Sequence, residues 1–462
     1  MQHLLGITGL VVLIGLAVGA GILVALWLTL SPWFTWKQRV MARTGGAWVH
    51  LIKRLSLQNW FEANMRAETG QPLDRPYGAH RGIFNFDNLQ FKPVYLSRAP
   101  LNDAPPVDAP DIDTEVILGP QALRPLRLKI PIVIGGMAYG SGYSLAAKVA
   151  LAKGAALAGT AANSGNGPFL AEERLYAAKY VLQYTRGFWS KAEDILKQAD
   201  MIEIALGHSA RGSAPVRVNG KKITPEVAER YGTIPGLDVL MEARLPEVEN
   251  MAQFKALIRR LKEVTDGVPV SVKFGASHYL EKELALFVEG GADVLAFDGT
   301  EGGTHGGMPL FMDEMGLPVL PALCRAARFI REQHLTNQVS LMIGGGLVTP
   351  GDFAKCLALG ADAVLIGTIT AMIQAHTQVT KAVPWEPPTG LLYNDAKEKT
   401  KYNPDLGAKH IHYFLHSCVA EMKLLARTLG KSSLRQLDCS DLMALDPLYA
   451  QIAGIEYVGG RR

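Results

Sequence analysis

The sequence predicts an α/β protein whose main domain is a (β/α)8, or TIM, barrel, with an N-terminal transmembrane helix and a C-terminal helical extension. From about residue 116, short β-branched runs alternate with amphipathic stretches, as they do when crossover helices join parallel strands. Eight such runs within about 250 residues fit a closed barrel better than an open sheet. Glycine supplies 47 of the 462 residues, which suits tight turns and ligand sites lined by backbone.

The first expected element is an apolar segment at residues 4–30 that contains no charged residue. Its length is enough to cross a bilayer with some tilt. Trp33, Phe34 and Trp36 follow where an aromatic belt is expected, and Lys37 begins a basic stretch. The pattern predicts a single-pass protein of the inner, cytoplasmic membrane with the barrel facing the cytoplasm. A cleaved signal peptide, which normally begins with basic residues, and a buried core helix are the alternatives.

Residues 31–115 contain few periodic segments and several prolines, and are predicted to form a linker and an extended arm. The barrel is predicted at residues 116–380. Its strands are expected at 130–134, 155–158, 201–206, 237–241, 268–274, 293–297, 339–343 and 363–366, with helices such as 251–264, 280–289 and 352–359 between the later ones. A dinucleotide-binding open sheet is disfavoured, because no G-x-G-x-x-G turn precedes a helix with an acidic residue about 20 residues on.

Residues 381–462 are predicted to form a helical extension packed on the barrel. The stretch 411–429 is amphipathic and ends at Gly430, a good helix stop, and 442–452 is expected to be a shorter second helix.

Composition excludes several classes of function. The net charge of +4 is small for this length, and no basic stripe with interleaved aromatics is present, so no nucleic-acid partner is expected. Four scattered cysteines do not suit a disulfide framework or a metal site, and no metal is predicted. They are Cys324, Cys356, Cys418 and Cys439.

Two glycine clusters late in the barrel form the strongest chemical pattern. Gly344, Gly345 and Gly346 end one expected strand, and Gly367–Thr368 ends the next. In barrels, the loops after strands 7 and 8 form a phosphate site from exposed backbone N–H groups and a helix N-terminus. The alternative is a pair of tight turns that bind nothing.

Lys273 extends the phosphate site to a flavin. Strand alternation places it inside the barrel mouth, where an ammonium can stabilise negative charge near N1 and O2 of reduced FMN. A structural lysine paired with an acidic neighbour is the alternative. The next loop, 298–307, offers Glu301 and His305 as proton donors or substrate contacts among glycines that include Gly303. A solvated loop is the alternative there.

Several motifs together resemble the central and FMN-binding domains of glutamate synthases. They are PIVIGGMAYGSGYS (131–144), NSGNG (163–167), IEIALG (202–207), KKITPEVAERYG (221–232), VSVKFG (270–275), DGTEGGT (298–304) and IGGGL (343–347). The resemblance covers about residues 85–455 and suggests a stand-alone member. It implies an FMN barrel in which ammonia condenses with 2-oxoglutarate and the imine is reduced to glutamate. The implied flavin contacts are Met137, Ala138, Tyr139, Asn163, His208, Lys273, Gly303, Gly344, Gly345, Gly346, Gly367 and Thr368.

The departures from this family also lead to predictions. The stretch 370–390 contains no cysteine where the family carries an iron–sulfur centre, so no cluster is expected. No glutaminase domain is evident, so a separate ammonia-supplying subunit and an external electron donor are expected partners. Asn166 replaces the usual acidic residue, and the loops after 206 and 241 differ, so the keto or amino acid substrate is left open. Arg211 or Arg244 is expected to hold its carboxylate, with surface ion pairing as the alternative.

Two other functions are compatible with the sequence. One is a non-redox barrel, such as a phosphosugar or nucleotide isomerase, that keeps only the phosphate site. The other is a barrel that has lost catalysis and serves as a flavin-binding membrane scaffold.

Overall fold

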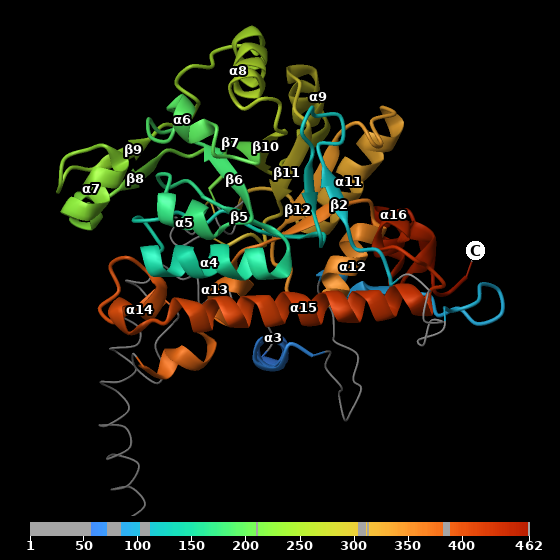
Figure 1. Ribbon diagram of the computed structural model, residues 1–462. Coiled ribbons are helices and arrows are strands. Elements are labelled where there is room, and N and C mark those ends of the chain that lie inside the picture. The colour runs from blue at the N-terminus through green and yellow to red at the C-terminus, as the bar shows by residue number, and fades with distance from the viewer. Residues whose placement is uncertain are drawn as a thin grey trace, which may run out of the picture.

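Eight parallel strands form a nearly closed barrel at the centre of the molecule (Figure 1). The computed structural model describes residues 57–71, 85–101, 111–208, 211–303, 311, 314–381 and 389–460. In sheet order the strands are β4 (Ile132–Ile134), β13 (Ala363–Ile366), β12 (Ser340–Gly344), β11 (Val294–Asp298), β10 (Val270–Gly275), β7 (Met201–Ala205), β6 (Lys179–Tyr184) and β5 (Ala161–Asn163). At the seam between β5 and β4, the Thr160 hydroxyl donates to the Ile132 carbonyl at 2.6 Å.

Residues alternate between the barrel interior and the surrounding helices along each strand. The inward apolar residues form a cluster of their own, for example Val133, Val181, Met201, Ala296 and Met342. The same cluster includes Val116, Leu118, Leu126 and Leu128 of an antiparallel hairpin, β2 (Val116–Leu118) and β3 (Leu126–Leu128). This hairpin therefore fills one end of the barrel, and the Gly119 N–H after β2 donates to the hydroxyl of Ser340, the first residue of β12, at 3.1 Å. The opposite, carboxyl end is left for polar and glycine residues.

Helices cover the outside of the barrel. In chain order they are α4 (Leu145–Ala158), α5 (Ala171–Tyr176), α6 (Glu193–Leu196), α8 (Met251–Val264), α9 (Leu280–Gly290), α11 (Val319–Glu332), α12 (Pro350–Ala358) and α13 (Thr368–Ala375). A separate projection consists of β8 (Val216–Val218), η2 (Gly220–Lys222), α7 (Pro225–Tyr231) and β9 (Val239–Met241). It packs through its own apolar cluster onto Tyr139, Leu170 and Trp189.

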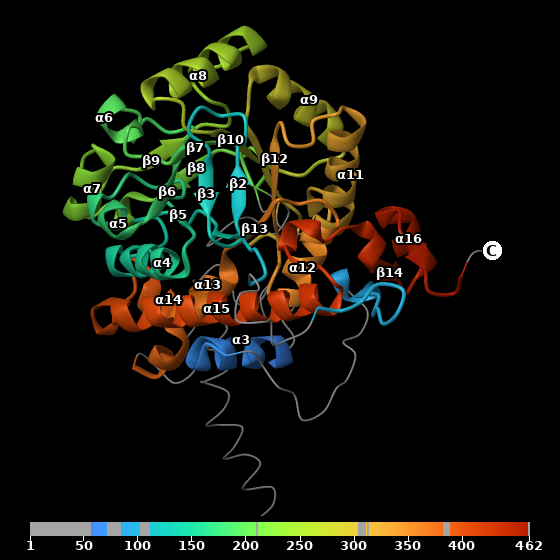
Figure 2. The ribbon, with the colours of Figure 1, turned by 45° about the vertical axis from the view of Figure 1, so that its right-hand side comes forward.

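A long helix, α15 (Pro404–Thr428), lies beneath the barrel, with α4 on one side and α3 (Leu57–Thr69) on the other (Figure 2). The helix begins at Pro404 because the Asn403 side chain accepts hydrogen bonds from the next two backbone N–H groups. Its approach to α4 depends on Gly154, where an added Cβ would lie 2.7 Å from Cβ of Ile411. Shorter elements precede it, namely η3 (His376–Lys381), α14 (Thr389–Leu392) and η4 (Lys399–Lys401).

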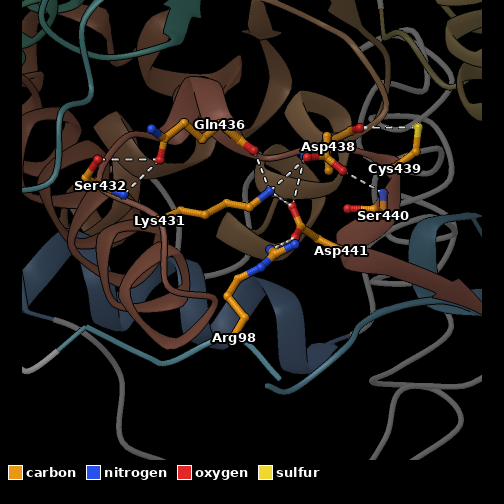
Figure 3. A network of polar contacts seen from close by, with 9 residues as sticks. Arg98, Lys431, Ser432, Gln436, Asp438, Cys439, Ser440 and Asp441 are labelled. Carbon is orange, nitrogen blue, oxygen red and sulfur yellow. Dashed lines mark hydrogen bonds and ion pairs between the residues drawn. The ribbon is translucent and has the colours of Figure 1, made fainter. Parts of the chain in front are cut away.

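The arm before the barrel is joined to the end of the chain. β1 (Leu89–Phe91), which follows η1 (Asn85–Asn88), pairs with β14 (Leu442–Ala444), and β14 pairs with β15 (Glu456–Tyr457). Buried Lys431 bonds the Asp438 and Asp441 carboxylates, and Arg98 of the arm bonds Asp441 at 2.9 Å (Figure 3). The remaining tail elements are η5 (Leu434–Gln436), η6 (Cys439–Asp441) and α16 (Pro447–Ala453).

The structure confirms the parallel eight-stranded barrel but corrects several expected elements. Residues 155–158 are not a strand but the end of α4, which the left-handed residue Gly159 terminates. The strand at 237–241 belongs to the projection, and the true third strand is β6, which the sequence prediction missed. The segment 442–452 begins as β14 and becomes helical only at Pro447.

The predicted location is also corrected. Within the ranges that the structure describes, no helix combines the length and the apolar character needed to cross a membrane. The expected span at 4–30 lies outside those ranges. On this finding, the structure does not support a single-pass protein of the inner membrane.

Candidate active site

The carboxyl end of the barrel divides into a polar half and a glycine half. Five neighbouring strands carry an inward polar residue at or beyond their midpoint, and the next three end at or just before glycines. The polar set is Asn163, Gln183, Glu203, Lys273 and Asp298, from β5, β6, β7, β10 and β11 in that order. The glycines are Gly344, Gly367 and Gly135, at the ends of β12, β13 and β4. One side of the mouth therefore offers hydrogen-bonding groups, and the other leaves space beside bare backbone.

A buried network joins the first three strands of the polar half. Glu203 Oε1 accepts hydrogen bonds from Asn163 Nδ2 at 3.0 Å and from Gln183 Nε2 at 2.8 Å. Asn163 Oδ1 in turn accepts from the backbone N–H of Gly165 at 2.9 Å, which fixes the turn after β5. Glu203 is only 1% exposed, so its carboxylate lies inside the barrel.

Lys273 lies inside the mouth, as alternation predicted. Its Nζ is 2.6 Å from Asp298 Oδ1 on the adjacent strand, so the ammonium has an acidic partner in this state. His208, just past β7, is close to both groups. Its burial, together with the nearby cations Arg211, Lys273 and Arg186, lowers the pKa of His208 to about 4, although Asp298 opposes the shift. His208 is therefore neutral near pH 7.

The structure separates the two arginines expected to bind substrate. Arg211 is half-buried close to His208, and burial lowers its pKa. Arg244 is exposed on the loop after β9. A third arginine that the sequence prediction missed, Arg186, lies beside Arg211 with 4% exposure. It donates to the carbonyls of Ser213, Ala214 and Ala243, and so holds the loops that carry the other two arginines.

The glycine half is shaped by the loop after β11. An added Cβ on Gly344 would lie 2.5 Å from Asp298 Oδ1, and on Gly346 it would lie 2.7 Å from Cβ of Glu301. Gly345 and Gly346 also have positive φ angles of 121° and 67°. Gly344 and Gly346 need to be glycine because the loop after β11 lies so close to them that a side chain would not fit. At Gly367, in contrast, an added Cβ would meet nothing within 4 Å, so this turn at the start of α13 borders open space.

The two glycine loops after β4 and β5 pack backbone against backbone. A Cβ on Gly165 would lie 2.5 Å from the Met137 carbonyl carbon and 2.7 Å from the Ala138 nitrogen. The Tyr139 ring turns into the apolar cluster under the projection, and its hydroxyl is 3.2 Å from Glu226 Oε1. Gly165 therefore faces the backbone of Met137 and Ala138 rather than that of Tyr139.

A buried ammonium supports the second loop from behind. Lys148 of α4 is fully buried, and its Nζ donates to the carbonyls of Asn163 and Ser164 at 2.8 and 3.1 Å. It also pairs with Glu173 at 2.8 Å, and Tyr180 donates to the same carboxylate. The loop that carries Asn163 is thus fixed by an ion pair in the interior.

The remaining predicted residues lie in the loop after β11. Glu301 Oε2 accepts from the backbone N–H of Val319 at 2.8 Å, so its carboxylate anchors the start of α11. Gly303 lies against Thr368, because its added Cβ would be 2.6 Å from Thr368 Oγ1. His305 lies outside the described residues. The cysteines fall on α11, α12, α15 and η6, away from the mouth, and no group of three metal-binding side chains occurs in the described part of the chain.

Sequence reasoning missed Lys148, Gln183, Arg186 and Glu203. One pattern does point to Glu203, because a carboxylate inside the apolar run IEIALG is rarely buried without a purpose. Gln183 was missed together with its strand. No local pattern marks Lys148 or Arg186, whose partners are distant in sequence.

Comparisons with known proteins identify the family of the chain. The family model for the conserved region in glutamate synthase matches residues 100–432. A glutamate synthase large subunit-like protein of Rhizobium meliloti is 31% identical over 86% of this chain and 93% of its own length. An archaeal-type NADPH glutamate synthase of Thermotoga neapolitana is 28% identical, over 80% of this chain and 76% of that protein.

Among solved structures, the flavin-binding domain of baker's yeast flavocytochrome b2 matches with a TM-score of 0.47 and 13% identity, covering 82% of this chain and 80% of that one. A likeness of that size carries no argument about function. The family match spans most of the chain and includes every strand of the barrel. The chain therefore belongs to the glutamate synthase family.

Proposed function

We propose that the chain is an FMN-dependent oxidoreductase of the glutamate synthase type. It would reduce the imine of a keto acid that resembles 2-oxoglutarate to an amino acid, or catalyse the reverse reaction. The observation that carries this proposal is the two-sided mouth, in which the polar half faces a glycine half in a barrel of this family.

The residues of the mouth suit FMN. The open turn at Gly367 precedes α13, and a helix N-terminus of this kind favours a phosphate group. Thr368, Gly344, Gly345 and Gly346 complete that side. On the polar side, Asn163, Lys273 and His208 would contact the ring, with Met137, Ala138 and the Tyr139 backbone along the loop after β4 and Gly303 along the loop after β11. FMN, when bound there, supplies a ring that accepts and returns hydride.

The chain's own side chains would orient the substrate and move protons. Lys273 brings positive charge to the ring side of the mouth, held in place by Asp298. Arg211 is better placed than Arg244 to hold a substrate carboxylate, since it lies beside His208 at the mouth. Glu301 and His305 are proposed proton-transfer groups, although Glu301 also anchors α11. The electron donor and any ammonia-supplying subunit would be separate proteins.

Two measurements on the purified full-length protein test this function. Fluorescence titration should show FMN binding, and a Lys273→Met variant should bind at least about tenfold more weakly, a loss of about 1.4 kcal/mol. The exposed Arg244→Met serves as a control and should bind FMN like the wild type. Reduced protein should then be reoxidised by a keto acid plus ammonium, with the amino acid identified by mass spectrometry. A protein that takes up no FMN would refute the proposal.

A further inference from the structure

Helix α13 connects the open turn at Gly367 with the helices beneath the barrel. It begins at Thr368, directly after that turn, and its eight residues make a helix about 12 Å long. Four of its side chains are no more than 2% exposed, namely those of Ile369, Thr370, Ile373 and Gln374. A helix that is buried along its length moves as a unit, because close packing around it leaves no room for one turn to adjust alone.

The carboxyl end of α13 is held by two segments that are distant in sequence. His376, the residue after the helix, has its Nε2 atom 2.7 Å from Glu68 Oε1 of α3. The ring of His376 also lies edge-on to that of His410 on α15, with 5.4 Å between the ring centroids. His410 in turn donates a hydrogen bond to the Ile373 carbonyl. The position of this end of α13 is therefore tied to both α3 and α15.

The docking of α3 depends on a small set of contacts near its carboxyl end. Ala63 and Ala67 are 2% and 0% exposed. The Arg66 guanidinium donates from Nε and Nη2 to the two carboxylate oxygens of Glu421, at 2.8 and 3.0 Å. Thus α3 rests on α15 and reaches α13 through Glu68 in its last turn.

The amino end of α13 is tied to the turn where a phosphate would bind. The Thr370 hydroxyl donates to the Gly367 carbonyl at 2.5 Å. A phosphate at that turn would accept hydrogen bonds from N–H groups of the first turn of the helix. Because α13 moves as a unit, fixing its amino end also fixes His376 against Glu68.

We propose that α13 couples the binding of FMN to the docking of α3, with Glu68 and His376 as the positioning residues that transmit the effect. This inference rests on the proposed function, in which the FMN phosphate lies at the Gly367 turn. The coupling must be reciprocal. Bound FMN holds α3 more firmly, and a loosened α3 weakens the binding of FMN.

Hydrogen exchange of residues 57–71 tests the first direction in the full-length protein. It is measured without ligand, with saturating FMN, and with riboflavin, which has the same ring but no phosphate, bound to the same extent. FMN should slow exchange there at least about fivefold, the lower end of typical coupling between two sites, and riboflavin should have little effect. Residues 251–264 of α8, on the opposite side of the barrel from α15 (Figure 1), serve as the internal reference.

Glu68→Ala tests the other direction, because it removes the contact with His376 far from the mouth. Glu289→Ala is the matched control. Each glutamate is the penultimate residue of its helix, has a side chain about half exposed (46% and 57%), and pairs with a side chain on a neighbouring element. Glu68→Ala should raise the FMN dissociation constant about fivefold or more and abolish the effect of FMN on exchange in 57–71. Glu289→Ala should change neither property.

Three results overturn the inference while leaving the proposed function intact. They are exchange in 57–71 that FMN does not change, exchange that riboflavin slows as much as FMN does, and a Glu68→Ala protein that keeps either the wild-type affinity or the wild-type effect on exchange. A wild-type protein that binds no FMN would instead defeat the proposed function, and this inference with it. Circular dichroism of both variants confirms that they are folded before they are compared.

Discussion

At the scale of single residues, two buried lysines hold parts of the chain that are distant in sequence. Lys148 joins α4 to the backbone of the loop after β5, and Lys431 joins the carboxylates of the tail. Both are paired with acidic residues in the interior, at Glu173 and Asp441. A buried pair of this kind adds little net stability, but removing one partner leaves the other charge buried without compensation.

Replacing Lys148 with methionine should therefore lower the free energy of unfolding by about 3–5 kcal/mol. The physical reason is that Glu173, which is fully buried, would lose its cation. Urea denaturation measures the change. Lys153→Met removes a pair with Asp405 near the surface and should cost no more than about 1 kcal/mol. Equal losses in the two variants would contradict this account.

At the scale of elements, the site depends on loops that touch through their backbones. The turn after β5 approaches the turn after β4 so closely that Gly165 has no room for a side chain. The same closeness positions Met137 and Ala138 at the mouth. Small changes in these turns should therefore affect binding more than changes in the strands.

Gly165→Ala should weaken FMN binding at least about tenfold and lower stability by about 1–3 kcal/mol, because the new methyl group would collide with Met137. Gly232→Ala is the matched control. Gly232 has nearly the same φ, 68° against 67°, but an added Cβ there would meet nothing within 4 Å. FMN titration and denaturation compare the two. If the control lost binding equally, backbone strain rather than loop contact would be responsible.

The helix pair α3–α15 carries a pH dependence of stability. Burial, reinforced by the neighbouring His376, lowers the pKa of His410 to about 4 from an ordinary 6.5. Glu68, which pairs with His376, and Lys409 are the other nearby charges. Because the unfolded chain takes up this proton more readily, stability should fall as pH drops from about 6.5 towards 4.

The slope from this histidine should approach about 1.4 kcal/mol per pH unit within that window. Denaturation of the wild type and of His410→Leu at several pH values measures it. The variant should lose this part of the slope, whereas His334→Asn, at an exposed position, should keep it. A slope that is unchanged in His410→Leu would show that other groups are responsible.

At the scale of the whole molecule, the arm at 85–101 and the C-terminal tail from about residue 431 are joined to one another. The arm strand β1 pairs with the tail strand β14, and Arg98 of the arm bonds Asp441 beside Lys431 (Figure 3). The amino end of the barrel is filled by the β2–β3 hairpin. Because the hairpin fills the amino end, the mouth of the barrel is the carboxyl end, where the polar residues and glycines lie.

Lys431→Met should loosen the arm and tail together while the barrel keeps its FMN affinity. The reason is that Asp441, 2% exposed, would lose the lysine and keep hydrogen bonds from Arg98 and from the backbone N–H of Asp438, and of these two donors only Arg98 is charged. Hydrogen exchange should rise by at least about tenfold in both 85–101 and 431–445, whereas Lys423→Met, which removes a surface pair with Asp111, should change little. Faster exchange in the tail alone would show that the arm is held independently.

Much of the fold followed from local patterns. Strand alternation and helix periodicity depend on consecutive residues, so they can be recognised in a sequence. They predicted the amphipathic helices between the later strands, the inward direction of Lys273 and the strands β7, β10, β11, β12 and β13. The run at 155–158 was wrongly predicted to be a strand because alanine and leucine suit a helix as well as a buried strand. β6 was missed because its inward Gln183 interrupts the apolar pattern.

By itself, the sequence determined the barrel, its glycine turns and the family to which the chain belongs. Only the tertiary structure decided that Asp298 pairs with Lys273, that Arg186 rather than Arg244 lies beside Arg211, and that Gln183 lies opposite Glu203 on the neighbouring strand. The physical reason is strand register. Which side chains meet across a sheet depends on how strands align, and that alignment is set by packing between residues far apart in the chain.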